Sequence, residues 1–565
     1  MNPTQKRWQI ASRITPSAEE ALHGYPPILQ QILFNRGYAT HAEARACLEA
    51  QPPFDTDPYQ LQGVAEAVDR LQIAIENGEK IAIYGDYDAD GVTATALLVG
   101  YFDALNVDVL GYIPHRFDEG YGLNKDAISI LSEEGVDIII SVDCGIRSLE
   151  EADHARDLGV DLIICDHHTP GDMLPNALAV IDPKRKDDAY PEKNLAGVGV
   201  AYKLACALDS KINGHESDLE DYLDLVALGT VADLVPLIGE NRSLVRQGLQ
   251  VIRRPRRQGL LSLIGVSGLK PAKVTAADIG FALGPRLNAA GRLDTALDAL
   301  NLLTTQDVFK AGRIAQQLEA QNRKRQDITR GIQAIADELA FADVSDPLLL
   351  FAAHPEFNAG VVGLAASRLT EQYYRPAVVG HIDEEYTRAS CRSIPEFNIT
   401  DALDRCADLL ERHGGHAAAA GFTVRNENLP RLIERLQAIA EEQLSDQELQ
   451  PTLNADIKLP LSELKPELLD HLEWMQPTGY GNPQASFVSR NVKVMSSRAV
   501  GKDSAHLKLV VSDGHITFDA IAFRLGHWYG NLPQRIDLLY HFEVNEFRGK
   551  KTLQLNVRDI KPSKV

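Results

Sequence analysis

Three aspartates stand at alternate positions early in the chain, Asp86, Asp88 and Asp90. Carboxylates this close repel one another, and their burial is tolerable only if cations compensate the charge. Hard divalent cations bind carboxylate oxygens, so this spacing indicates a metal site. Asp and Gly are also ordinary turn formers, and on this segment alone an acidic surface turn is an equal alternative.

The elements around these acids determine whether they can act together. The apolar run before them, residues 81–84, has no polar alternation and predicts a strand buried on both faces. We expect Gly91 to interrupt the chain before a helix that begins near Thr93. The acids would then lie at the carboxyl end of a strand, the edge where open parallel sheets bind ligands.

Two further apolar runs end in side chains of metal-ligand type. Asp143 follows the first run, and Asp166, His167 and His168 follow the second. Such clusters at three strand exits of one sheet are hard to produce by chance. Downstream, Asp233 lies in an apolar neighbourhood, where a buried acid needs a partner.

The coarse pattern predicts α/β architecture with an all-β end. Buried strands alternate with helices and predict a doubly wound parallel sheet, with strands at residues 81–84, 108–113, 137–142, 161–165 and 179–181. A long helix at 310–340 with a thin apolar stripe indicates a bridge between two α/β lobes. Alternating segments at 487–523 and 541–559 predict a small closed barrel. We place the parts at residues 1–55 (helical segment), 56–265 (first α/β lobe), 266–342 (connecting helices), 343–450 (second α/β lobe) and 451–565 (barrel).

Composition narrows the class of protein. The formal net charge of -22 disfavours indiscriminate attraction to nucleic acid, so a polyanion site must be a local basic surface. The six cysteines are scattered without zinc-like spacing and predict reduced thiols. No span resembles a membrane helix and the amino terminus lacks the apolar core of a secretory signal, so we expect a cytoplasmic protein with no membrane partner.

Four motifs together resemble those of a known family. DYDADG (86–91), VDCG (142–145), DHH (166–168) and GTVADLVPL (229–237) are similar, in order and spacing, to the motifs of the DHH phosphoesterase superfamily. Within it, the chain resembles the bacterial 5′-to-3′ exonucleases specific for single-stranded DNA, over nearly all residues after 55. The resemblance implies a DHH catalytic domain, a DHHA1 domain and an oligonucleotide-binding (OB) barrel.

The resemblance also implies a two-metal mechanism with Mn²⁺ or Mg²⁺. The implied metal ligands are acids and one histidine: Asp86, Asp88, Asp90, Asp143, His167 and Asp233. Asp143 would bridge the two ions and Asp166 would orient the histidines. His168 would lie beside the scissile phosphate, where it either steadies an oxygen or protonates the leaving group.

An enzyme that starts at a 5′ end also needs donors for the terminal phosphate. The candidates for 5′-phosphate and DNA contacts are polar residues in stretches that the resemblance places near the cleft: Arg116, Arg286, Asn288, Arg292, Ser390, Arg392, Gly415 and His416. We expect the Gly-Gly-His sequence to lie at a helix start, where free N–H groups favour an anion, or at a helix stop. Some barrel aromatics could stack on bases, although most aromatics of small barrels are simply core residues: Phe518, Phe523, Trp528, Tyr529, Phe542 and Phe547.

Three other functions compete with this hypothesis. A DHH phosphodiesterase acting on short oligonucleotides would share the metal motifs but lack the barrel. A family II pyrophosphatase normally has His where this chain has Tyr84. A non-catalytic DNA-binding replication scaffold would have lost ligands, and here none is lost. The resemblance further implies DNA repair and recombination as the setting, single-strand-binding protein and a RecQ-type helicase as partners, and a monomer.

Overall fold

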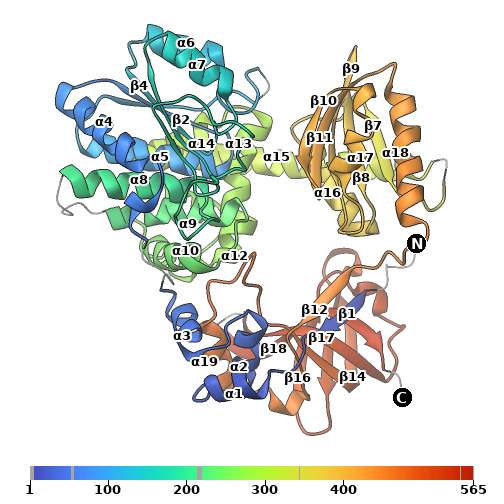
Figure 1. Ribbon diagram of the computed structural model, residues 1–565. Helices are drawn as coiled ribbons and strands as arrows, with labels where there is room; N and C mark the ends of the chain where they lie inside the picture. The colour runs from blue at the N-terminus through green and yellow to red at the C-terminus, as the bar shows by residue number, and fades with distance from the viewer. Residues whose placement is uncertain are drawn as a thin grey trace. The chain divides into compact units, whose positions relative to one another are not determined.

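The structure is a computed structural model, which describes residues 6–51, 56–116, 118–212, 219–342, 344–547 and 549–563. The chain forms two compact units (Figure 1). Residues 8–319 and 454–565 belong to one unit, and residues 320–453 belong to the other. Within the described ranges, no helix combines the length and apolar character needed to cross a membrane.

The larger unit contains the predicted parallel sheet. Five strands pair in the order β3-β2-β4-β5-β6, all parallel. Their bounds are β2 Ile81–Gly85, β3 Val109–Tyr112, β4 Ile138–Val142, β5 Asp161–Cys165 and β6 Ala179–Ile181. Every residue of β2 and β4 is buried, which explains why these segments are apolar without alternation. The prediction of a doubly wound α/β fold is confirmed for this part of the chain.

Helices cover this sheet and extend the same core. Helix α4 Val64–Asn77 precedes the sheet, and the helices between its strands are α5 Ala89–Ala104, α6 Lys125–Glu133 and α7 Leu149–Asp157. Those that follow the sheet are α8 Gly197–Ile212, α9 Leu223–Ala232, α10 Gly239–Ile252, α11 Gln258–Val266, α12 Ala276–Asp278, α13 Gly284–Leu293 and α14 Leu297–Thr304. One hydrophobic cluster runs from α4 through the sheet to α14, so the connecting helices are continuous with the sheet domain.

The predicted start of α5 near Thr93 is wrong. The helix begins at Ala89, and Gly91 lies inside its first turn. The Asp88 carboxylate caps it by accepting hydrogen bonds from the N–H groups of Asp90 (2.8 Å) and Gly91 (3.3 Å). A Cβ at position 91 would lie 2.5 Å from backbone atoms of Asp86, so this glycine serves close packing instead of a helix break.

The smaller unit is a second α/β domain. The predicted bridge helix is present as α15 Val308–Ala340. A mixed five-stranded sheet follows, in the order β10-β11-β9-β8-β7, with only β7 and β8 parallel. Its elements are β7 Leu350–His354, α16 Val362–Tyr373, β8 Ala377–Ile382, β9 Tyr386–Arg392, α17 Ile399–Asp404, β10 Leu410–His416, β11 Ala419–Arg425 and α18 Leu429–Leu444.

Gly415 and His416 do not lie at a helix terminus, and both predictions for the Gly-Gly-His sequence are wrong. It forms the end of β10, an edge strand that pairs with β11. Gly415 has φ +147°, and a Cβ there would lie 2.4 Å from the carbonyl oxygen of Ala419. The glycine is therefore required by close strand pairing.

The carboxyl-terminal part is a closed barrel, as predicted. Five strands close because β14 pairs with both β15 and β17: β14 Phe487–Val500, β15 His506–Ser512, β16 Thr517–Ala522, β17 Arg535–Phe547 and β18 Lys550–Pro562. The short strand β13 Ile457–Lys458 and helix α19 Pro466–Glu473 precede them. The amino-terminal helices are α1 Pro16–Ala21, α2 Pro27–Asn35 and α3 His41–Glu49. Leu22, which follows α1, and apolar side chains of α2 and α3 share the barrel's hydrophobic core.

Candidate metal centre

Aspartates line one edge of the parallel sheet. The strand ends are in register, with Gly85 opposite Val142, Val142 opposite Cys165, and Cys165 opposite Ile181. The residue that directly follows each of these strands is an aspartate: Asp86, Asp143, Asp166 and Asp182. The chain leaves β2 for β3 on one side and returns to β4 on the other, so the switch point where open sheets bind ligands lies between β2 and β4.

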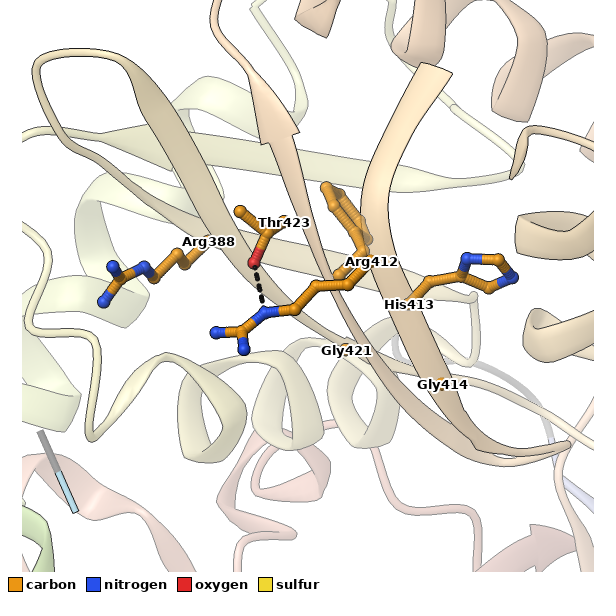
Figure 2. Close-up of a pocket in the computed structure, with 7 residues that line it drawn as sticks. Arg388, Arg412, His413, Gly414, Gly421 and Thr423 are labelled. Carbon is orange, nitrogen blue, oxygen red and sulfur yellow. Dashed lines mark hydrogen bonds between the residues drawn. The ribbon is translucent and has the colours of Figure 1, made fainter. Parts of the chain in front are cut away.

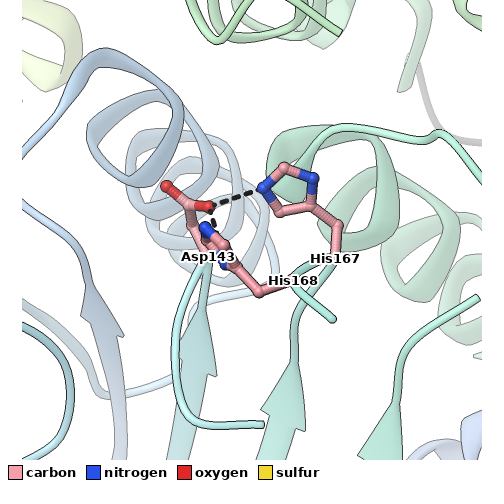
Figure 3. A group of neighbouring side chains, drawn as sticks. All are labelled: Asp143, His167 and His168. Carbon is pink, nitrogen blue, oxygen red and sulfur yellow. Dashed lines mark hydrogen bonds and ion pairs between the residues drawn. The ribbon is translucent and has the colours of Figure 1, made fainter. Parts of the chain in front are cut away.

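The predicted ligands gather into two adjoining groups. Asp86, Asp88 and Asp143 form one group, with one ligand atom from each lying within 4.8 Å of the others. A second group meets the same limit: Asp90, His167 and Asp233. The groups touch, because His167 Nε2 lies 3.0 Å from Asp143 Oδ1 (Figure 3). The structure therefore brings together all six residues proposed as metal ligands.

Backbone amides hold Asp90 in place. Its Oδ2 accepts a hydrogen bond from the N–H of Gly197 (2.7 Å), and its Oδ1 accepts one from Val198 (2.9 Å), both at the start of α8. A helix N-terminus stabilises a carboxylate through these free N–H groups and the helix dipole. The side chain also needs space, since a Cβ at Gly229 of α9 would lie 2.7 Å from Asp90 Oδ1.

Asp143 adopts a strained backbone conformation that presents its carboxylate to both groups. Its φ is +62°, in the left-handed region that costs free energy for a residue other than glycine. A Cβ at Gly197 would lie 2.8 Å from the Asp143 Cβ, so α8 packs directly against this residue. Such strain persists only where the surroundings enforce it, and it is typical of functional sites.

Burial dominates the electrostatics of the acids. It raises the pKa of Asp86, Asp90 and Asp143 well above the ordinary value, and neighbouring carboxylates raise each further. The pKa of Asp233 rises to about 7 through burial and then the charge of Asp88. Oδ1 of Asp86 is buried and has no hydrogen-bond partner within the described part of the chain. A carboxylate oxygen without a hydrogen-bond partner, among acids whose pKa values are raised, fits a site built for cations.

The two histidines differ in environment. Burial, followed by the charge of His168, lowers the pKa of His167 to about 3, so its imidazole is neutral and suited to metal binding. His168 is also desolvated, but its hydrogen bond and charge attraction to Asp166 raise its pKa to about 8. Asp166 Oδ1 lies 2.8 Å from His168 Nδ1, and Asp166 also accepts from backbone N–H groups at Ile146 and His167.

Asp166 thus contacts the histidines and sits outside the two ligand groups, as the orienting role requires. Burial alone would raise its pKa, but the hydrogen bond and charge of His168, with the Ile146 amide, hold it below the ordinary value. The carboxylate fixes which ring nitrogen of His168 faces it and which faces the site.

Among the candidate phosphate contacts, those of the larger unit lie in different settings. The Arg116 guanidinium lies 4.8 Å from the Tyr87 ring centroid, and its charge lowers the pKa of Asp86. Arg286 is paired with Glu319 at 2.7 Å, so its guanidinium is already engaged. Arg292 belongs to α13 and acts electrostatically on Tyr87.

Asn288 has a different contact from the DNA contact we expected. Its Oδ1 accepts a hydrogen bond of 2.7 Å from the N–H of Ala89, the first residue of α5. This bond holds the helix start that carries Asp88 and Asp90. In this structure Asn288 positions the acidic segment.

Two candidates of the smaller unit, Ser390 and Arg392, lie on one face of its sheet. Ser390 and Arg392 alternate along β9, and a Cβ at Gly363 in α16 would lie 3.4 Å from both Ser390 Oγ and Arg392 Nη2. The two side chains therefore converge on the first turn of α16. Gly415 and His416 lie at the exposed edge of the same sheet.

Two residues near the metal-ligand groups, Asp182 and Lys184, were not predicted from the sequence. Asp182 is fully buried, and its Oδ2 has no hydrogen-bond partner among the described residues. Burial raises its pKa to about 7. Lys184 follows two residues later, and its charge partly opposes the rise in the pKa values of Asp233 and His168. The available signal was an acid directly after the apolar run of β6, the same pattern as at the three strand exits identified.

Comparison with known proteins defines the class. The model of the DHH family, N-terminal domain, matches residues 80–230, and the DHHA1 domain matches residues 345–442. The model of the RecJ OB domain matches residues 455–559. With the metal-ligand groups at the sheet edge, these matches make the chain a DHH phosphoesterase with a DHHA1 domain and an OB barrel.

More specifically, the chain belongs to the RecJ family. It is 38% identical over 566 residues to the single-stranded-DNA-specific exonuclease RecJ of Bacillus subtilis, covering 99% of this chain and 71% of that protein. It is 36% identical over 578 residues to RecJ of Salmonella typhimurium, covering 98% and 99%. The crystal structure of Thermus thermophilus RecJ in complex with Mn²⁺ matches with a TM-score of 0.85 at 30% identity, covering 99% of this chain and 80% of that one.

Proposed function

We propose that this protein hydrolyses single-stranded DNA from its 5′ end, releases 5′-mononucleotides, and depends on two divalent cations, Mn²⁺ or Mg²⁺. The observation that carries this function is the pair of adjoining ligand groups that meet at Asp143 and His167. Relatives named single-stranded-DNA-specific exonucleases, and a relative's structure with Mn²⁺, support the substrate and the metal.

The residues present fit two cations. One ion would be held by Asp86, Asp88 and Asp143, and the other by Asp90, His167 and Asp233, with Asp143 shared between them. Two cations about 3.5 to 4 Å apart supply an activated water and neutralise charge on the phosphate oxygens. An imidazole among carboxylates shifts the preference toward Mn²⁺.

We assign His168 to the phosphate that is cleaved. Its Nδ1 is held by Asp166, so its other ring nitrogen faces away from that carboxylate and is available for substrate. With its pKa raised to about 8, the imidazole carries a proton at neutral pH and donates a hydrogen bond to an anionic oxygen. A protonated donor serves either a non-bridging oxygen or the leaving group.

Recognition of the 5′-phosphate falls to Ser390 and Arg392. Both side chains meet the first turn of α16, whose N-cap residue Val361 makes no side-chain capping bond. A guanidinium, a hydroxyl and helix N–H groups are the donors that phosphate oxygens require. Arg116 beside Asp86 and Arg292 are the remaining candidates for contacts to the strand.

The barrel supplies a surface for the bases. Phe523 and Tyr529 are exposed and stay candidates for stacking. Phe518 and Phe542 are buried and pack edge to face in the barrel core, so of the two alternatives these aromatics are core residues. Trp528 packs against the same core, and the Phe547 side chain lies outside the described residues.

A broader setting follows from the family and remains a proposal. We place the protein in the cytoplasm, as a monomer, in DNA repair and recombination. Single strands are exposed there by a RecQ-type helicase and covered by single-strand-binding protein, so these two are the expected partners.

The decisive experiment follows release of nucleotides from a long single strand labelled at its 5′ end, with Mn²⁺ or Mg²⁺ present. Duplex, dinucleotide and pyrophosphate serve as alternative substrates. Asp143→Asn should lower the rate by more than about 100-fold, since even outer-shell changes cost about 10- to 100-fold.

The matched control is Asp161→Asn. Asp161 starts β5 at the opposite edge of the same sheet, where it pairs with Arg70 at 2.6 Å. This variant should keep its activity. Mononucleotide release that persists in excess chelator, or equal losses in both variants, would rule out the mechanism.

A further inference from the structure

One face of the β9–β11 sheet carries a row of basic and hydroxyl side chains. Along β9, Thr387, Ala389 and Cys391 point into the hydrophobic core, and the alternate residues point to the opposite face. Those alternate residues are Arg388, Ser390 and Arg392. Arg388 therefore lies one pleat, about 6.7 Å, from Ser390 on the same face.

The neighbouring strands extend this face sideways. Thr423 of β11 lies opposite Arg388, and Arg412 of β10 lies opposite Thr423. Arg412 Nε donates a hydrogen bond of 3.3 Å to Thr423 Oγ1. In the next row, Ser390 is flanked by Gly421 and then Gly414, so the sheet has no side chains there.

These two rows form a trough. A cavity of about 330 Å³ is lined by Arg388, Arg412, His413, Gly414, Gly421, Phe422 and Thr423. Figure 2 shows the Arg388 and Arg412 guanidinium groups reaching toward the same side, with Thr423 between them and His413 pointing away. The floor is backbone at the glycines, and the walls are cationic.

The two arginines of this trough carry charge that the protein does not neutralise. In the described part of the chain, neither Arg388 nor Arg412 has an ion-pair partner. The acid next to Arg412 in sequence, Glu411, is held by Arg425 at 2.9 Å. Other surface arginines of this unit do pair with acids, as Arg435 does with Asp408.

We propose that this trough is an anion subsite that binds a phosphate group of nucleic acid, in addition to the 5′-phosphate contact at Ser390 and Arg392. Two guanidinium groups and a hydroxyl around an open floor match the oxygens of a phosphate, and the open glycine rows let it approach the backbone. In a chain of net charge -22, an unpaired basic surface of this kind is where a polyanion can bind.

The origin of the phosphate rests on the proposed function, and two sources share this chemistry. One is the backbone of the single strand. The other is the phosphate of a released mononucleotide. The double variant Arg388→Gln with Arg412→Gln removes both charges while keeping most of the side-chain length. Arg435→Gln is the matched control, because it removes a surface arginine of the same unit whose charge Asp408 already neutralises.

Binding is measured with the full-length protein and Mn²⁺, using fluorescence anisotropy on a single strand whose 5′-terminal linkages are phosphorothioate. We expect the double variant to bind about 10-fold more weakly, since hydrogen bonds to charged groups are worth at least that factor. For the double variant, the slope of log K against log salt concentration should become shallower by about 0.7 for each phosphate that is no longer neutralised. The control should match the parent in both quantities.

Two further readouts separate the possibilities. In the double variant, the preference for 5′-phosphorylated over 5′-hydroxyl strands should stay as in the parent. Loss of this preference would mean that the trough and the Arg392 contact are one site, and it would refute a separate subsite. If strand binding is unchanged but inhibition by a 5′-mononucleotide weakens, the trough holds the product phosphate. If neither changes, no phosphate binds there. A parent protein that binds but never cleaves would refute the proposed function and leave the subsite standing.

Discussion

Removing the metal should make the stability of this protein fall as pH rises. In the metal-free fold, the pKa of Asp233 is raised to about 7, whereas an unfolded aspartate titrates near about 3.9. Between these values the folded state binds a proton that the unfolded state has lost. Stability therefore decreases with pH wherever the folded state holds more protons.

The size of the effect follows from that one group. Between about pH 6 and about pH 8, Asp233 alone removes about 1.4 kcal/mol from the free energy of unfolding. This is a fall in Tm of about 3 to 6 °C for a domain of about 150 to 250 residues. The raised pKa values of Asp86, Asp90 and Asp143 act in the same direction, whereas the lowered pKa of His167 acts in the opposite direction.

The assay is thermal unfolding at both pH values in excess chelator and again with Mn²⁺. Cations bind the deprotonated carboxylates, so the stabilisation by Mn²⁺ should grow with pH and reverse the trend. Asp233→Asn should flatten the slope in chelator, while Asp161→Asn at the far edge of the sheet should not. If the Tm measured in excess chelator stays constant or rises with pH, the inference that these acids are buried together with raised pKa values is refuted.

Three substitutions test other parts of the structure. Arg392→Ala should slow cleavage of 5′-phosphorylated strands about 10- to 100-fold, as expected for removal of a charged hydrogen bond, and slow 5′-hydroxyl strands much less; equal reductions would remove this residue from the 5′-phosphate contact. Asn288→Ala removes the acceptor for the Ala89 N–H, so kcat should fall while the free energy of unfolding falls by only about 1 kcal/mol. An unchanged kcat would show that the hydrogen bond from Ala89 to Asn288 does not position the acids. Arg242→Met should lower the free energy of unfolding by about 3 kcal/mol, because the buried guanidinium donates to five backbone carbonyls of Cys47 and residues 474–477; a Tm equal to that of the parent would contradict this anchoring.

Sequence reasoning located the metal-ligand groups because their signal is local. An apolar run followed by an acid is visible in a few residues, and it recurs before Asp86, Asp143 and Asp166. It did not identify Asp182, although the strand at residues 179–181 was predicted, because a single acid followed by Pro183 is also typical of an ordinary turn. It also misplaced the start of α5, since Gly91 resembles a helix breaker when the reason for it is contact with the backbone of Asp86.

Tertiary context decided the features that were predicted wrongly. The Gly-Gly-His sequence has no side-chain alternation at its glycines, so nothing in the sequence marks it as the edge strand β10. In the barrel, the face of an aromatic depends on register and closure. Phe518 points inward and Phe523, on the segment that follows β16, is exposed, although both were equal candidates for stacking.

The convergence of the acids depends on strand order as much as on the acids themselves. Asp86 and Asp88 follow β2, and Asp143 follows β4, two strands separated in sequence by β3. Because β3 pairs on the far side of β2, β4 becomes the neighbour of β2 and its aspartate is brought beside theirs. Had β4 added next to β3, Asp143 would lie one strand further away, about 4.8 Å more, and could not be shared between two ions. The crossover from β2 to β3 and the return to β4 thus determine the metal centre, and the motif spacing indicates that topology only indirectly.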